Sequence, residues 1–182
     1  EATERRSNAI ALVQSFMQSQ NRPLKIWYTL PVSPNGLTVE GVNIVNSALE
    51  NGVELSGVNI MAMDYGYQTA PNPENYMGEY AILSAESLHS QLTILYSDME
   101  NNLSSEDIWQ KIGITPMIGM NDVTTEIFNL EDAEQLKNFG LEMNIKQLSI
   151  WSANRDKECE DWVIGHVDIS CSSILQDNHE FS

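Results

Sequence analysis

Carboxylate, amide and aromatic side chains stand where short apolar runs of this sequence end. Asp64 and Asn121 each follow such a run directly, and Trp151 closes another. A carboxylate beside an apolar segment is costly unless it is solvated or hydrogen-bonded, so Asp64 belongs to a reactive site, a helix cap or a loop salt bridge. Indole rings offer sugars a flat apolar surface with a polar edge. The set therefore fits a carbohydrate site, with a core position for Trp151 as the alternative.

The ends of the apolar runs contain no histidine or cysteine. His89, His166 and His179 are scattered over the expected helix and tail segments, where they are more readily explained as surface or core residues than as ligands. A Ser-His-Asp triad and a zinc site both need imidazole or thiolate groups brought together. The sequence therefore gives little support to either, and we expect no metal and no cofactor.

The elements that must position these side chains follow a repeating pattern. Strands are expected at 24–32, 58–63, 112–120 and 147–151, and helices at 4–20, after Thr38, at about 79–96 and at 130–143. Strands that alternate with helices form a parallel sheet, whose carboxyl ends share one edge. Four such strands could form a small open sheet or half of a closed barrel. Periodicity alone does not separate these two architectures.

Length and charge limit the classes of protein to which this chain can belong. The chain has 182 residues and 42% hydrophobic residues, enough for one domain, but a barrel of eight strand–helix units typically takes about 250 residues. Because the chain begins at Glu1 with a helix already under way, a fragment or processed chain and a natural mature N-terminus both stay open. The net charge of −17 disfavours nucleic acid as a partner. No apolar run approaches the ~20 residues of a membrane span.

Two cysteines and one glycosylation sequon indicate the cellular compartment of the protein. Cys159 and Cys171 flank a polar, irregular stretch near the C-terminus. A disulfide between them would staple a segment with little core of its own and would indicate an oxidising compartment, whereas two free thiols are the alternative. Asn102 begins the sequence Asn-Leu-Ser, an acceptor for N-glycosylation in a polar loop. Both features favour a secreted or extracellular protein.

Several long motifs resemble glycoside hydrolase family 18, the chitinase family, in its bacterial-type subgroup. KIWYTLPVSPNGLT (25–38), VNIMAMDYG (58–66), IGITPMIGMNDVTTEIFNLEDAEQL (112–136) and QLSIWSANRD (147–156) are similar, in that order, to the segments at its fifth to eighth strands, and the tail with CSSI (171–174) and EFS (180–182) also follows the subgroup. The resemblance implies an α/β fold of the (β/α)8 TIM barrel type. This chain would cover about strands 5 to 8. Residues 1–182 would then be the C-terminal half of one catalytic barrel, with a disulfide-bearing tail at 157–182.

The resemblance also implies an activity. Family members cleave β-1,4-linked N-acetylglucosamine polymers by substrate-assisted retention, in which the sugar's own acetamido group is the nucleophile. Their acid catalyst is the last residue of a D-x-x-D-x-D-x-E run on the fourth strand. No such run occurs here, and we expect it upstream, with Glu1 as its last residue left undecided. The isolated chain is then expected to be inactive. A non-catalytic, lectin-like or structural protein on the same barrel is the alternative function.

The resemblance further implies roles for individual residues and partners. Asp64 would bind near the acetamido group as the catalytic carboxylate, although the tyrosine that many members have before it is replaced by Met63. The residues implied to bind substrate are Met61, Met63, Tyr65, Asn121, Glu126 and Trp151. Met61 and Met63 would line the pocket, and Trp151 would stack beneath the sugar ring. The expected partners are chitin or its oligosaccharides and a missing N-terminal half-barrel.

Overall fold

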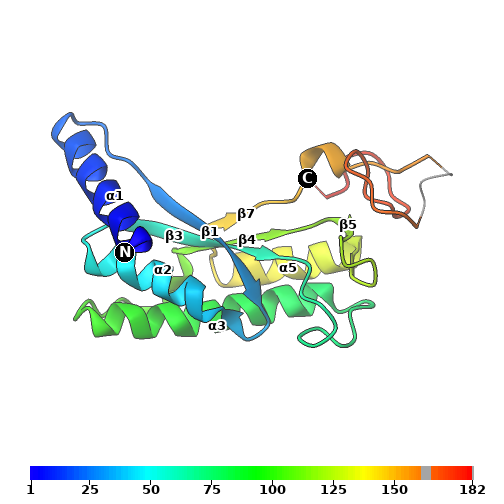
Figure 1. The fold of residues 1–182 in the computed structure, drawn as a ribbon. Coiled ribbons are helices and arrows are strands. Elements are labelled where there is room, and N and C mark those ends of the chain that lie inside the picture. The colour runs from blue at the N-terminus through cyan, green and yellow to red at the C-terminus, as the bar shows by residue number, and fades with distance from the viewer. Residues whose placement is uncertain (161–164, 182) are drawn as a thin grey trace.

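The chain forms a mostly parallel β-sheet, as a computed structural model of residues 1–160 and 165–181 describes it (Figure 1). The sheet has the order β2-β1-β3-β4-β7. Neighbouring strands among β1, β3, β4 and β7 are parallel, and β2 is antiparallel to β1. The strands of this sheet are β1 (Ile26–Ser33), β2 (Gly36–Leu37), β3 (Leu55–Ala62), β4 (Ile112–Pro116) and β7 (Gln147–Leu148). The expected parallel strands are confirmed, although β7 is shorter than 147–151.

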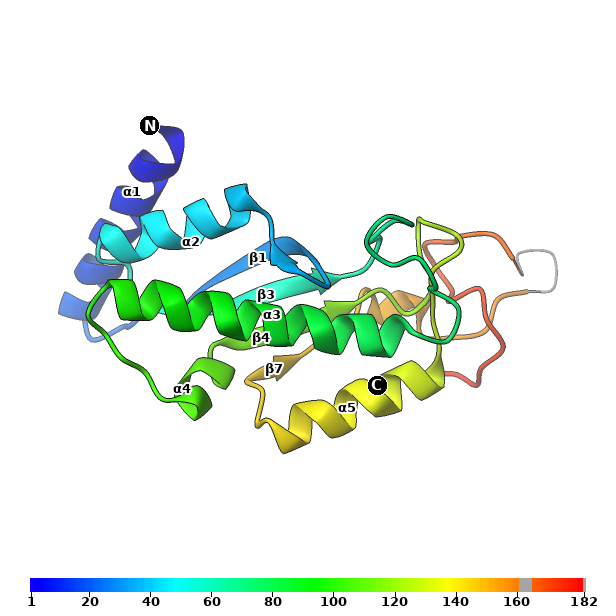
Figure 2. The same cartoon turned by 90° about the horizontal axis from the view of Figure 1, so that it is seen from below.

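Helices connect the strands in the expected alternation. They are α1 (Ala2–Ser19), α2 (Val39–Glu50), α3 (Met77–Asp98), α4 (Ser105–Trp109) and α5 (Leu130–Glu142). The hydroxyl of Thr38 accepts the N–H of Gly41 and so caps α2, as the sequence predicts. Figures 1 and 2 show α2, α3 and α5 lying along one face of the sheet, with α1 at the end where the parallel strands begin.

The hydrophobic core lies between the sheet and these helices. Ile60 and Ile114, from adjacent strands, and Leu88 and Leu92 of α3 are fully buried members of one cluster. Each such side chain stabilises the fold by about 1.5–3 kcal/mol through burial. The sheet is therefore held against its helices on one side, and its carboxyl edge is fixed by this packing.

The other face of the sheet is polar where the strands run side by side. Asn59 accepts a hydrogen bond from the Thr115 hydroxyl at 2.9 Å and approaches the Thr29 hydroxyl at 3.5 Å. Thr115 in turn lies 2.8 Å from the hydroxyl of Ser149. This row crosses β1, β3, β4 and the segment after β7, and no helix lies over it in Figure 1. A sheet covered on one face only is the arrangement expected of part of a barrel, whose other face is the barrel interior.

Two features at the carboxyl edge were not predicted from the sequence. A short hairpin pairs β5 (Gly119–Met120) with β6 (Ile127–Phe128), and a turn of 3-10 helix spans Ala153–Arg155. The predicted disulfide is present between Cys159 and Cys171, with an S–S distance of 1.98 Å. Residues 161–164 and 182 of the expected tail lie outside the described residues. Within the described part of the chain, no helix is long and apolar enough to cross a membrane.

Candidate functional site

The loops that follow β3 and β5 interlock at the carboxyl edge of the sheet. Asp64 lies two residues after the end of β3 and has a positive φ of 52°. Its N–H donates to Oδ1 of Asn121 at 3.3 Å, and its own Oδ1 accepts the N–H of Val123 at 2.9 Å. Because each loop donates to the other, the exposed carboxylate of Asp64 is fixed in direction. The predicted proximity of Asp64 and Asn121 is therefore seen in the structure.

Asn121 and Glu126 lie beneath this loop, and both are fully buried. The amide group of Asn121 donates to the carbonyls of Met117 and Gly119 at 2.9 and 3.1 Å. The carboxylate of Glu126 accepts two backbone N–H groups of the loop after β3. Burial raises the pKa of Glu126, the nearby charge of Asp64 acts in the same direction, and the backbone hydrogen bonds lower it. Direct sugar binding by either residue stays a prediction, and their burial favours a supporting role.

Tyr65 turns into the helix layer. Its hydroxyl accepts a hydrogen bond from Ser84 of α3 at 3.1 Å, and its ring meets Tyr80 edge-on at 6.2 Å. Burial is the main reason that the pKa of Tyr65 is raised above its usual value. Tyr65 therefore anchors the loop to α3, and its expected contact with substrate stays a prediction. Tyr67, two residues on, is exposed, and the sequence reasoning did not single it out.

Trp151 lies in the segment after β7, beside the residues that follow β4. The backbone N–H of Trp151 donates to the carbonyl of Pro116, and its backbone carbonyl accepts the N–H of Ile118. Trp151 therefore extends the pairing of β4 and β7. The peptide bond after Trp151 is cis. The side chain is 58% exposed, which argues against a position in the core of this chain. Its exposure at the carboxyl edge leaves the indole able to meet a ligand.

Met61 and Met63 belong to the same edge and are partly exposed. Met61 pairs with Thr115, a member of the polar row, so it shares the uncovered face of the sheet. The pairing of Ala62 with Pro116 places Met63 one step further, beside Met117, which bridges to Trp151. The register thus arranges Met63, Met117 and Trp151 across three neighbouring segments.

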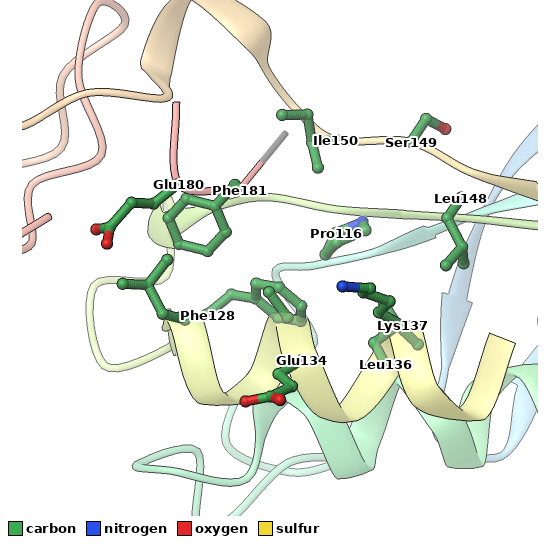
Figure 3. Close-up of a pocket in the computed structure, with 12 residues that line it drawn as sticks. Pro116, Phe128, Glu134, Leu136, Lys137, Leu148, Ser149, Ile150, Glu180 and Phe181 are labelled. Atoms are coloured by element: carbon green, nitrogen blue, oxygen red, sulfur yellow. The ribbon is translucent and has the colours of Figure 1, made fainter. Parts of the chain in front are cut away.

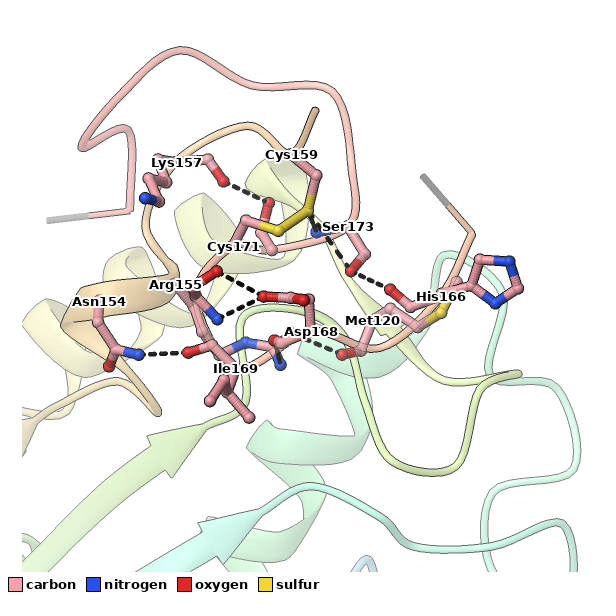
Figure 4. The surroundings of a disulfide bond; sticks show 12 residues. Met120, Asn154, Arg155, Lys157, Cys159, His166, Asp168, Ile169, Cys171 and Ser173 are labelled. Carbon is pink, nitrogen blue, oxygen red and sulfur yellow. Dashed lines mark hydrogen bonds between the residues drawn. A yellow bond between two sulfur atoms is a disulfide. The ribbon is translucent and has the colours of Figure 1, made fainter. Parts of the chain in front are cut away.

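A buried arginine holds this edge together, and the sequence reasoning did not identify it. The guanidinium of Arg155 donates to the carbonyls of Ile118 and Met120 at 3.1 and 2.7 Å, and to that of Asp168 in the tail at 2.6 Å (Figure 4). Its side chain is 2% exposed. Burial lowers the pKa of Arg155, whereas the charges of Asp122, Asp168 and Asp64 raise it. Arg155 therefore ties the disulfide-bearing tail to the backbone just before Asn121.

A separate groove lies away from the predicted site residues. A groove of about 700 Å³ lies between α5, the segment after β7 and the end of the tail, as Figure 3 shows. Phe128, Leu136, Leu148 and Phe181 are among its lining residues, and none of the predicted site residues is. Its lining is chiefly apolar, and Glu134, Lys137 and Glu180 are its charged members.

In the described part of the chain, the histidine on α3 packs against an aromatic ring. Among the residues that the structure describes, no three His, Cys, Asp or Glu side chains are grouped to hold a metal ion. The ring of His89 stacks on Trp109 at 4.3 Å and lies 3.1 Å from the Ser105 hydroxyl. His89 thus has a packing role on α3, as the sequence reasoning favoured.

Comparisons with known proteins find chitinases. No protein-family model matches the chain. The chain is 41% identical over 157 residues, 84% of its length, to the probable bifunctional chitinase/lysozyme of Escherichia coli (strain K12) and to Endochitinase 11 of Metarhizium anisopliae, and covers 17% and 29% of them. The catalytic domain of a hyperthermophilic chitinase from Pyrococcus furiosus superimposes with a TM-score of 0.79 and 34% identity.

The match to the solved structure spans 96% of this chain and 54% of the Pyrococcus chain. Site mutants of active domain 2 of the same organism's thermostable chitinase, complexed with chito-oligosaccharides, agree equally well, with a TM-score of 0.79. The chain thus spans about half of these solved domains and less than a third of the two curated relatives. By sequence and by its α/β fold, which covers part of a TIM-type barrel, the chain is homologous to part of the catalytic domain of chitinases, in agreement with the resemblance to glycoside hydrolase family 18.

Proposed function

We propose that this chain supplies the substrate-positioning side of a chitinase site that cleaves β-1,4-linked N-acetylglucosamine polymers. The observation that carries the proposal is the shared edge: an exposed, fixed carboxylate at Asp64 and an exposed indole at Trp151 belong to the carboxyl ends of strands in one sheet. In barrels of this type, working residues come from the ends of several different strands. A flat aromatic surface and a carboxylate acceptor are the groups that an acetylated sugar ring requires.

The reaction proposed is substrate-assisted hydrolysis with retention. The acetamido oxygen attacks the anomeric carbon, the bond to the leaving sugar breaks, and an acid outside this chain's recognised motifs donates a proton to the leaving oxygen. Asp64 accepts the acetamido N–H and stabilises the positive charge that develops on this group. Trp151 stacks beneath the ring, and Met61 and Met63 form the apolar wall of the pocket. Water then opens the cyclic intermediate.

The same proposal includes a second half-barrel that completes the site. Residues 1–182 are proposed to be the C-terminal half of one catalytic barrel, with the acid-catalyst run on the other half. Three observations support this partner: the polar face of the sheet bears no helix, Leu12 and Phe16 of α1 are exposed, and the groove beside Leu148 is apolar. Of these surfaces, α1 precedes β1 and the groove lies beside β7, toward the two ends of the strand order, where a closed barrel would continue.

An extracellular location follows from the same set of features. The Cys159–Cys171 disulfide persists in oxidising compartments. Asn102 is exposed in the segment before α4, so its sequon is accessible to a glycosyltransferase. We therefore propose a secreted glycoprotein that meets chitin outside the cell.

A sugar-binding protein without hydrolysis is the second candidate. It is favoured by one observation, Met63 at the position where many family members have a tyrosine. A complete barrel with a replaced acid would bind chitin oligosaccharides through the same Asp64 and Trp151 without cleaving them.

The experiment compares Asp64→Asn and Trp151→Ala in the full-length protein, with chitin oligosaccharide hydrolysis and binding as readouts. Asp64→Asn is expected to lower kcat by about 10²- to 10³-fold, as for loss of one charge-stabilising group. Trp151→Ala is expected to weaken binding about tenfold through lost stacking. Asp98→Asn, at an exposed position of α3, is the matched control. Unchanged rates and binding in both variants would remove the assignments, and binding without cleavage by the parent would select the second candidate.

A further inference from the structure

We infer that Glu126 is a positioning residue that acts through Asp64 by holding the turn on which Asp64 stands. This inference rests on the proposed function of Asp64, and it assigns Glu126 a role other than sugar binding. Its basis is a pair of backbone hydrogen bonds that the buried carboxylate accepts from the two residues after Asp64.

Three successive backbone N–H groups lie in the turn after β3, beyond the last residue of β3 that pairs with β4. The N–H of Asp64 meets Asn121, while those of Tyr65 and Gly66 meet the two oxygens of Glu126 at 3.0 and 2.7 Å. A carboxylate accepts two such bonds at once, whereas a neutral amide offers one acceptor and presents a donor on its other side. Glu126 therefore matches this turn in a way that glutamine cannot.

The backbone at Asp64 needs such support. Its φ of 52° is left-handed, a conformation that residues other than glycine adopt at a cost and keep when their surroundings enforce it. Gly66 follows with a φ of 77°, which glycine adopts freely. Releasing the N–H groups of Tyr65 and Gly66 would let the turn relax, and the direction of the Asp64 carboxylate would change with it.

The loop that carries Glu126 is itself closed, so the carboxylate is held rigidly. The N–H of Asn121 donates to the carbonyl of Glu126, and the N–H of Glu126 donates to that of Val123, at 2.9 and 2.8 Å. Val123 then returns a hydrogen bond to the carboxylate of Asp64. The two loops form a closed ring of contacts from Glu126 through the turn to Asp64 and back.

Full burial separates Glu126 from the reacting groups. Its side chain has no exposed surface, whereas Asp64 and Trp151 are exposed. Burying a carboxylate costs free energy, and here its hydrogen bonds fix the geometry of the turn. Its effect on catalysis should therefore be transmitted entirely by Asp64.

The test is a double-mutant cycle in the full-length protein with Glu126→Gln and Asp64→Asn. Glu126→Gln alone is expected to lower kcat for chitin oligosaccharides by roughly 10- to 100-fold, the value of one charge-assisted hydrogen bond, with KM little changed. In the Asp64→Asn background the same change should have no further effect. An equal loss in both backgrounds would overturn the inference, because Glu126 would then act independently of Asp64. Glu86→Gln, at an exposed position of α3, is the matched control.

A second measurement does not depend on activity. Amide hydrogen exchange of the unaltered protein should show Tyr65 and Gly66 protected relative to the exposed Tyr67 and Gln68. Glu126→Gln should speed exchange at the first two and leave the core strands unchanged. Exchange of Tyr65 and Gly66 as fast as that of their exposed neighbours would overturn the inference without any variant. If the parent neither binds nor cleaves chitin oligosaccharides, the proposed function fails, and exchange still decides whether Glu126 holds the turn.

Discussion

Replacing Arg155 by methionine should loosen the carboxyl edge of the sheet. The change keeps an aliphatic stem of similar length and removes a guanidinium that donates to the carbonyls of Ile118, Met120 and Asp168. The first two bonds are buried, and each acceptor left without a donor costs about 1–3 kcal/mol. Recovery of the guanidinium's hydration offsets part of this, so we expect a net loss of about 3 kcal/mol.

Thermal unfolding under non-reducing conditions measures this loss. For a protein of this size, about 3 kcal/mol corresponds to a Tm lowered by roughly 6–12 °C. Lys157→Met is the matched control, because it removes the same charge from an exposed side chain two residues away. A Tm for Arg155→Met equal to that of the parent, or an equal decrease for Lys157→Met, would refute the view that Arg155 fixes the tail to the sheet.

Three further predictions concern the same edge. Gly119→Ala should lower stability by about 3 kcal/mol in thermal unfolding, because φ is +70° there and an added Cβ would clash with the carbonyl oxygen of Ser172; an unaltered Tm would contradict this clash. Replacing Cys159 and Cys171 by serine should cost about 3 kcal/mol, the chain entropy of a loop of this length, and equal Tm values with and without the disulfide would count against it. Burial raises the pKa of Glu126, so ionisation of this carboxyl group costs more free energy in the folded state than in the unfolded state. As the pH rises from about the ordinary pKa of 4.5, the parent should therefore lose stability relative to Glu126→Gln. Unfolding of both proteins across the acid range would show this trend, and a difference that stays constant or runs the other way would rule it out.

The local elements could be predicted because their signals are local. Thr38 before α2 is a side-chain cap whose effect reaches only three residues, and it is present as predicted. Asn129 caps α5 in the same way, although the sequence reasoning did not single it out. Apolar runs with β-branched residues predicted β1, β3 and β4. The run 147–151 gives a shorter strand, because pairing after Leu148 continues only through a single bridge at Trp151.

The side-chain environment of the site could be predicted only in part. Register places Asp64 and Trp151 at one edge, as parallel strands require, and both are exposed. The burial of Glu126 could not be read from its neighbours, since it depends on a loop 60 residues away in sequence. Arg155 could not be predicted for the same reason, because two of its acceptors are backbone carbonyls 35 and 37 residues distant in sequence. Every residue has a backbone carbonyl, so the residue type does not indicate which ones accept a hydrogen bond.

A crystal structure of the full-length protein with a bound chitin oligosaccharide would show which side chains contact the sugar. We predict that one N-acetylglucosamine ring lies on the indole of Trp151 with its acetamido group at the carboxylate of Asp64. A sugar bound elsewhere, such as in the groove beside Leu148, with Asp64 and Trp151 both free of it, would refute the proposed site.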